Sequence, residues 1–213
     1  MFIQLIGIFP KGVIKPIMSQ LTKLKKYCIR RKVFAIGGAT VQVLDGKNEV
    51  AAYSQHKSSA GGKQTIAVYS DESKRETLFL ICQKNNIGPD FSYDVKDASG
   101  ENVLGTVTQK GIKSAIQTTL EVEYNGEKYL IKEDSALLAF LRRYKSPIAL
   151  IPPKYKLLKG NKILGIYKKR FYPFQYRLDV QLNKQGDAAW SYVILAIGII
   201  LASLAIQNAY RAH

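Results

Sequence analysis

Several short stretches of the chain alternate apolar and polar residues, which is the pattern of half-buried antiparallel strands. Residues 120–132, "LEVEYNGEKYLIK", alternate on both sides of Asn125-Gly126, a dipeptide that suits a type I′ turn. Residues 91–95 and 176–182 alternate in the same way. The second of these separates into an apolar and a polar face: Tyr176, Leu178, Val180 and Leu182 against Arg177, Asp179 and Gln181. These patterns predict a β-hairpin and two further strands.

Three longer segments repeat one plan. Residues 41–55, 93–109 and 155–169 each read as a strand, a turn, an apolar pair and a second strand. Glycine adopts a positive φ without steric cost, which suits tight turns. The turn glycines of the three segments are Gly46, Gly100 and Gly160. An array of such hairpins predicts a meandering, mainly β body.

Helical patterns are few in the body of the chain. Residues 134–144, "DSALLAFLRRY", have a plausible N-cap, three leucines on one face and two arginines in the last turn. The leucines are Leu137, Leu138 and Leu141. Residues 13–26 predict a short amphipathic helix after Pro16, with Ile17, Leu21 and Leu24 facing inward. Both helices are too short to fill the interior of a sheet.

The segment from Ala188 to Ile206 is free of charge and apolar all round. As a helix it would measure about 28 Å, close to the hydrocarbon thickness of a bilayer. Aromatic and basic residues flank it as interfacial anchors do: Trp190 and Tyr192 at one end, Tyr210 and Arg211 at the other. Such a helix either crosses a membrane or is completely buried in protein.

A burial site exists if the strands close into a barrel. Each strand has one apolar face that needs a cover, and a many-stranded antiparallel barrel has room for a helix along its axis. The barrel would lack a core without the helix, and the helix would lack a cover without the barrel. Burial and a tail anchor therefore remain as two interpretations of this segment.

The formal net charge of +16 is unevenly distributed. Residues 1–44 hold eight Lys/Arg and no acid, and residues 135–178 hold eleven Lys/Arg and no acid, while residues 45–134 are close to neutral. Segregation of this kind predicts one or two positive faces, which suit polyanions such as lipid headgroups or nucleic acid. A solvated basic face without a partner is the alternative.

Residues that carry enzyme chemistry are scarce. The chain has two histidines, and no His/Cys/acid cluster has metal-ligand spacing. The stretch around Gly61-Gly62-Lys63 resembles a phosphate loop, but Lys57 stands where the first glycine is required and Gln64 where Ser or Thr is required. We therefore expect no catalytic site, no bound metal and no cofactor.

The two cysteines do not form a disulfide framework. Cys28 lies beside Lys25, Lys26, Arg30 and Arg31, which could lower its pKa, whereas Cys82 follows an apolar run. Buried or inert thiols are the simpler interpretation of both, and a reducing compartment follows.

Basic and aromatic residues are interleaved late in the chain. Lys168, Lys169 and Arg170 are flanked by Tyr167, Phe171 and Tyr172, as in a surface that binds phosphates and stacks bases. Strand alternation that turns the aromatic rings into a core explains the same residues.

The order of the segments also resembles a known family. "KYCIRRKVFAI", "VQVLDGKNEVAAYSQHK", "TIAVYSDESKRETLFLICQK" and "YDVKDASGENVLGTVTQK" follow one another, and "QYRLDVQLNKQGDAAWSYVILAIGIILASL" places the last strand directly before the apolar helix. Over residues 25–206 this pattern resembles the Tubby C-terminal-like superfamily, in its phospholipid scramblase and LURP-one-related branch.

The resemblance implies a closed antiparallel barrel of about twelve strands around a buried C-terminal helix. Residues 1–24 would form a basic N-terminal segment, 25–206 the barrel domain with its central helix at 188–206, and 207–213 a tail. Scramblases carry an acid-dense segment before the helix, where this chain has Asp179 and Asp187 alone, so calcium control is not expected. Members of the family associate with membranes or phosphoinositides, or translocate lipids.

The expected function is therefore non-enzymatic binding of anionic phospholipid by a cytoplasmic protein at the periphery of a membrane. The residues expected to bind lipid or another polyanion are Lys154, Lys156, Lys159, Lys162, Lys168, Lys169, Arg170, Lys25, Lys26, Arg30 and Arg31, with Lys23 nearby. The alternatives are an integral membrane protein anchored by residues 188–206, scramblase-like lipid translocation, and a barrel that binds nucleic acid.

Overall fold

The structure is a computed structural model that describes residues 21, 24–32, 40–58, 64–84, 90–111, 117–143, 151–171 and 175–210. Twelve strands and two longer helices account for most of them. The strands are β1 Lys26–Lys32, β2 Thr40–Leu44, β3 Val50–Ser58, β4 Gln64–Tyr69, β5 Thr77–Gln83, β6 Phe91–Asp97, β7 Val103–Gln109, β8 Thr119–Tyr124, β9 Glu127–Glu133, β10 Lys154–Lys159, β11 Lys162–Arg170 and β12 Arg177–Leu182. The helices are α3 Ala136–Arg143 and α4 Ala188–Tyr210.

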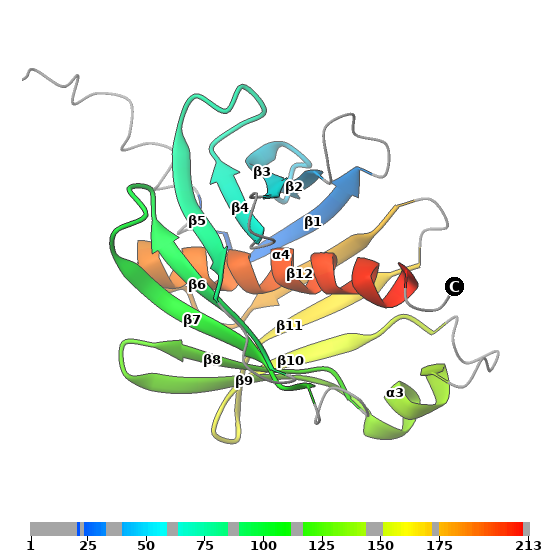
Figure 1. Cartoon of the computed structure of the whole chain (residues 1–213). Helices are drawn as coiled ribbons and strands as arrows, with labels where there is room; N and C mark the ends of the chain where they lie inside the picture. The colour runs from blue at the N-terminus through cyan, green and yellow to red at the C-terminus, as the bar shows by residue number, and fades with distance from the viewer. Residues whose placement is uncertain are drawn as a thin grey trace, which may run out of the picture.

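The strands form one closed antiparallel barrel. Each strand pairs with its neighbours in the sequence, and β1 closes the sheet by pairing with β12. Helix α4 lies along the inside of this barrel, with the strands wrapped around it (Figure 1). The predicted fold class, a mainly β barrel around an apolar C-terminal helix, is confirmed.

The turns follow the predicted chemistry with one exception. In the β8–β9 hairpin, Asn125 and Gly126 have φ angles of 48° and 72°, as a type I′ turn requires. Two of the three turn glycines also have positive φ. In the β2–β3 turn, however, Asn48 rather than Gly46 takes the left-handed conformation, with φ of 65°. Asparagine tolerates this region because its side chain bonds locally to the backbone.

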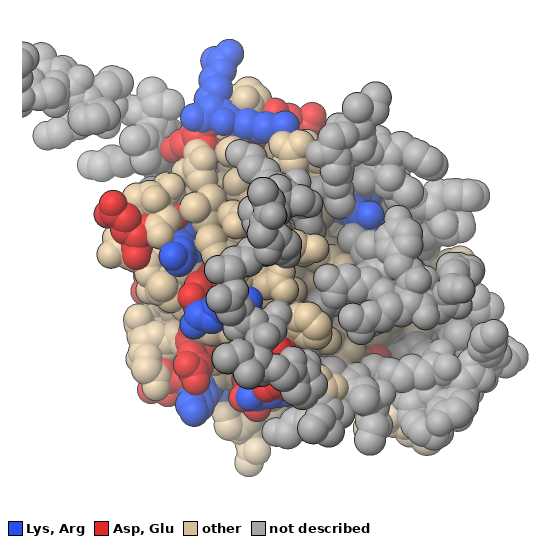
Figure 2. Space-filling view, viewed as in Figure 1, with Lys and Arg blue, Asp and Glu red and all other residues tan. Residues whose placement is uncertain are grey.

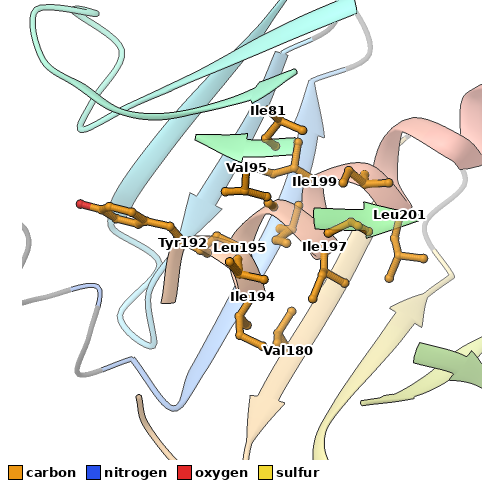
Figure 3. Packing of buried hydrophobic residues seen from close by; sticks show 14 of the residues in the cluster. Ile81, Val95, Val180, Tyr192, Ile194, Leu195, Ile197, Ile199 and Leu201 are labelled. Carbon is orange, nitrogen blue, oxygen red and sulfur yellow. The ribbon is translucent and has the colours of Figure 1, made fainter. Parts of the chain in front are cut away.

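The interior of the barrel is filled by α4. All residues from Tyr192 to Ile197 and from Ile199 to Ala202 are at most 6% exposed. Figure 3 shows side chains of this helix packed against strand residues such as Ile81, Val95 and Val180. Burial of one Ile or Leu side chain contributes about 1.5–3 kcal/mol, so the helix supplies a large share of the core. Of the two interpretations of the apolar segment, burial inside the barrel therefore holds for residues 192–202.

Two contacts show how closely the helix and the wall approach each other. A Cβ placed on Gly198 would overlap with Ile29 Cδ1 in β1, so the Ile29 side chain would have to move to admit a methyl group there. The buried Tyr167 hydroxyl in β11 donates a hydrogen bond to the carbonyl oxygen of Ile194, at 3.1 Å. Among the described residues, no helix meets the length and hydropathy needed to cross a membrane.

The shorter predicted segments differ from the structure in detail. Helix α3 begins where expected, and the Ser135 hydroxyl caps it by accepting a hydrogen bond from the Leu138 amide at 3.2 Å. Leu137 is 68% exposed, so this leucine does not belong to the buried face. Lys26 begins β1 and so does not end a helix over residues 13–26, most of which lie outside the described residues. Helix α4 runs to Tyr210, beyond the predicted end at Ile206.

Candidate anion-binding groove

A basic face covers the outside of four adjacent strands, β10, β11, β12 and β1. Outward positions alternate with the buried ones along each strand, and the register places basic residues side by side. Lys154 is the cross-strand partner of Lys168, and Arg170 is the partner of Arg177. Arg30 in β1 is the partner of Arg177 on the other side. Residues far apart in the sequence thus form one continuous cationic surface.

The middle of this face is hollowed. The cavity measures about 470 Å³ and its floor includes Cys28, Ile166 and Gln181. We call it the basic groove and define it by the cations that line it: Lys26, Lys154, Lys168, Arg170 and Arg177. Two carboxylates, those of Asp45 and Asp179, also line it, so the groove is formally positive by three charges.

The acids near the groove are shared between cations. Asp179 pairs with the Arg170 guanidinium and lies 3.9 Å from Arg177 Nε. At the edge of the groove, Asp134 pairs with Lys156 and lies 3.7 Å from Lys154 Nζ. Because neighbouring cations hold the charged form, the pKa of Asp134 is lowered and its carboxylate stays ionised.

Two of the lysines have no such partner. Within the described part of the chain, neither Lys26 nor Lys168 makes an ion pair, and both side chains are exposed. An anion that enters the groove would therefore meet two uncompensated ammonium groups and two guanidinium groups that are only partly neutralised. Guanidinium and ammonium donors of this kind bind phosphate oxygens well.

Sequence reasoning missed one central residue of this groove. Arg177 was not among the expected binding residues, yet it lies between Arg30, Arg170 and Asp179. The alternation of residues 176–182 already placed it on the polar face with Asp179, and that signal could have identified it.

The prediction that Cys28 is a buried thiol is confirmed, and its basic sequence neighbours do not lower its pKa. Arg177 Nε lies 3.1 Å from Cys28 Sγ, but burial outweighs this contact and raises the pKa of the thiol. Cys28 is 6% exposed, which makes it a small buried residue in the groove floor rather than a reactive thiolate. Both cysteines are free.

The structure divides the predicted binding residues into three groups. Lys26, Lys154, Lys168 and Arg170 line the groove, and Lys156 and Arg30 lie on the same face beside it. Arg30 is held there by hydrogen bonds from its guanidinium to Gln42 Oε1.

A second group lies at the end of the barrel that carries the β10–β11 turn. It consists of Lys25, Lys159 and Lys162. Lys159 forms an ion pair of 3.2 Å with Glu127 and lies 5.7 Å from the centre of the Tyr129 ring. These lysines are too far along the strands to line the groove.

The last two predicted residues face the other way. Lys169 is the register partner of the buried Leu178, and its ammonium lies 5.3 Å from the centre of the Tyr176 ring. Arg31 is the partner of the buried Val41, and its Nε atom is buried. Lys23 lies outside the described residues.

The strands on the opposite side of the barrel carry a different surface. In Figure 2 basic and acidic side chains lie next to one another over the front strands, β5–β8. Lys84 pairs with Asp94 at 2.9 Å, and Lys110 lies 3.1 Å from Asp90 and 3.5 Å from Glu121. Local pairing cancels charge there, whereas the basic face has too few acids to do so.

The aromatic residues considered for base stacking are split by the fold. Tyr167 is fully buried and faces α4, so it cannot stack on a ligand at the surface. Phe171 is 63% exposed, contrary to the expectation that alternation turns these rings inward, and Tyr172 lies outside the described residues.

No group of three or more His, Cys, Asp or Glu residues in the described segments is arranged to hold a metal ion. Comparison of the sequence with protein-family models and with curated proteins found no match.

Proposed function

We propose that the protein binds anionic phospholipid at a membrane surface through the basic groove, without changing the lipid chemically. The single observation that carries this proposal is the convergence of five cations from β1, β10, β11 and β12 on one concave surface with two carboxylates. The barrel with its central helix also agrees with the architecture implied by the resemblance to Tubby-like proteins.

Electrostatics supports a lipid surface as the partner. A juxtaposed anionic membrane attracts each nearby Lys or Arg by about 1 kcal/mol, and the attraction is screened by salt. Five cations less two carboxylates leave an attraction of about 3 kcal/mol at low salt, to which contacts with individual headgroups would add. Strand pairing also fixes the backbone positions of these cations relative to one another, because all five lie on paired strands of a closed sheet.

The test is sedimentation of the full chain with vesicles of phosphatidylcholine alone or with phosphatidylserine. We expect binding to the anionic vesicles that weakens steeply as salt rises. The double variant Lys168→Glu/Arg170→Glu should bind about thirtyfold more weakly or worse, since two contributions of about 1 kcal/mol are lost. The matched control is Lys74→Glu/Lys128→Glu, which makes the same charge change at exposed sites away from the groove.

Equal weakening in both double variants would mean that net charge, and not the groove, controls binding. An affinity for anionic vesicles that does not change with salt concentration, or no binding at all, would contradict the proposal. A single-stranded oligonucleotide added as a competitor separates the two polyanions, because a barrel that prefers nucleic acid would release the vesicles at low oligonucleotide concentration.

A further inference from the structure

The exposed apolar side chains lie at the two ends of the barrel, and one set of three adjoins cations of the basic groove. Among the described residues six large hydrophobic side chains are exposed. Three of them, Val50, Val103 and Ile163, occupy separate hairpins at the end where β3, β7 and β11 begin. Isolated residues of this kind are normal on a protein surface. The other three are Leu137, Ile151 and Phe171, and they lie at the opposite end.

The backbone places these three residues at the same end of the β10–β11 ladder. The Lys169 amide donates a hydrogen bond to the Pro153 carbonyl at 3.0 Å, which extends the β10–β11 ladder beyond the Lys154–Lys168 pair. Continuing the same register places Phe171 opposite Ile151. The Asp134 amide donates to the Lys154 carbonyl at 2.7 Å, so the start of α3, which carries Leu137, lies beside the same strand end.

All three side chains expose a large fraction of their surface to solvent. Leu137 is 68% exposed, Phe171 63% and Ile151 46%. We call this cluster the apolar rim. In Figure 1 it belongs to the end of the barrel marked by α3 and by the C-terminal end of α4, away from the β6–β7 and β8–β9 turns.

Cations adjoin the apolar rim directly. Arg170 precedes Phe171 in the chain, and Lys154 follows Ile151 by three residues. Both line the basic groove, together with Lys168 on the same ladder. An apolar group next to a row of cations is complementary to an anionic bilayer, whose headgroups meet the charges while the acyl region accepts the apolar side chains.

We infer that the apolar rim inserts into the bilayer interface, so that the barrel docks on the membrane with its α3 end down and the groove cations nearest that end, Lys154, Lys168 and Arg170, against the headgroups. This inference rests on the proposed function and adds an orientation and a second, apolar contribution to binding. The expected partner is a fluid bilayer that contains anionic lipid. A soluble headgroup could bind in the basic groove, but it has no acyl chains to accept the apolar rim.

Two tryptophan variants of the full chain test the orientation: Phe171→Trp, with Val103→Trp at the opposite end as the matched control. Both sites are more than half exposed, so a larger ring should be tolerated at each. With vesicles of phosphatidylcholine and phosphatidylserine, the indole emission added by Phe171→Trp should shift to the blue and be quenched by lipids that carry a spin label on the acyl chain. The control should show neither effect beyond the signal of Trp190 in the unmodified chain.

A second pair of variants measures the apolar contribution: Ile151→Ser/Phe171→Ser against Ile163→Ser/Val103→Ser, whose sites are exposed and outside the groove lining. The rim variant should lose at least about tenfold in vesicle affinity, because the burial of two apolar side chains is lost. This loss should persist at high salt, whereas the effect of charge reversal in the groove should fade. The control variant should bind like the unmodified chain.

The outcomes separate the two claims. If charge reversal in the groove weakens binding but the indole introduced by Phe171→Trp stays unquenched, the inference that the apolar rim inserts is overturned. The proposed function then stands. If the chain binds no anionic vesicles, both fail. If the emission of that indole shifts to the blue with rising protein concentration in the absence of vesicles, a second copy of the chain covers the rim and the inference is overturned.

Discussion

The Tyr124 hydroxyl lies 2.7 and 2.8 Å from the two carboxylate oxygens of Asp187 and donates its hydrogen bond to them. Asp187 is also the N-cap of α4, since its Oδ1 accepts a hydrogen bond from the Trp190 amide at 2.8 Å. One carboxylate therefore ties the β8–β9 hairpin to the first turn of the central helix. Trp190 adds to this connection between hairpin and helix, because its ring packs against those of Tyr124 and Tyr129 at centroid distances of 5.0 and 4.6 Å.

Removing this hydroxyl should weaken the whole barrel. Tyr124→Phe keeps the ring against Trp190 but deletes a hydrogen bond to a charged acceptor, and we expect a loss of about 1.5–3 kcal/mol in the free energy of unfolding. Denaturant titration followed by circular dichroism measures it. Tyr129→Phe is the control, because within the described residues its hydroxyl makes no hydrogen bond, and it should change stability by less than about 0.5 kcal/mol. Equal effects would show that the carboxylate contact is unimportant.

Alkaline pH should destabilise the fold. Burial, reinforced by the Asp187 carboxylate, raises the pKa of Tyr124 to about 12. Burial also raises the pKa of five other tyrosines: Tyr27, Tyr93, Tyr167, Tyr176 and Tyr192. Unfolding returns these groups to an ordinary pKa near 10, so their stabilising contribution is complete below about pH 10 and is lost as pH rises toward 12 and beyond.

The measurement is the free energy of unfolding at pH values from about 8 to about 12, which span the ordinary and the raised tyrosine pKa. We expect a plateau followed by a fall, with a shallower fall in Tyr124→Phe because one group with a raised pKa is absent. A free energy that stays constant through about pH 11.5 would show that the tyrosines are not sequestered as described.

The glycine of α4 should contribute to close packing. Gly198→Ala places a methyl group where Ile29 Cδ1 already lies, which forces the Ile29 side chain into another rotamer in a filled core and should cost about 1–3 kcal/mol. Ile29→Val removes that Cδ1 atom and, in the double variant, should recover part of the loss. Gly46→Ala is the control, since no atom lies within 4 Å of its added Cβ. Additive effects in the double variant would contradict direct contact.

Deleting residues 188–213 should abolish cooperative folding. The barrel would lose the side chains that fill it, and a closed sheet of this size cannot collapse to fill the space. We expect loss of near-ultraviolet circular dichroism and binding of a hydrophobic dye. A deletion variant that unfolds cooperatively like the full chain would mean that the strands alone form a stable core.

Cys28 should react slowly with thiol reagents. Its pKa is raised by burial and its sulfur is covered by Arg177, so near pH 8 the thiol should be modified far more slowly in the native protein than in the denatured chain. The Cys82→Ser variant isolates the reaction of Cys28. Reaction as fast as that of a free thiol would contradict the buried position in the groove floor.

Local signals determined much of the fold. The alternation in residues 120–132 with Asn125-Gly126 at the centre defined the β8–β9 hairpin, because strand periodicity and turn conformation are both properties of adjacent residues. The same holds for β12, whose polar face was separated correctly. The apolar segment from Ala188 was recognisable as a helix that needs a nonpolar environment on every side.

Only the tertiary structure decided where that helix goes and which cations share a surface. A membrane and a barrel interior both offer apolar contacts on every side, so the sequence of residues 188–206 fits either one. The pairing of β1 with β12 closes the barrel around the helix and so provides the second. Likewise, alternation separates Lys168 from Lys169, but only the closed barrel decides that Lys168 faces the groove and Lys169 the Tyr176 ring. The pairing of β1 with β12 brings Lys26 and Arg177 to one groove, because register across a closed sheet depends on contacts between residues far apart in the sequence.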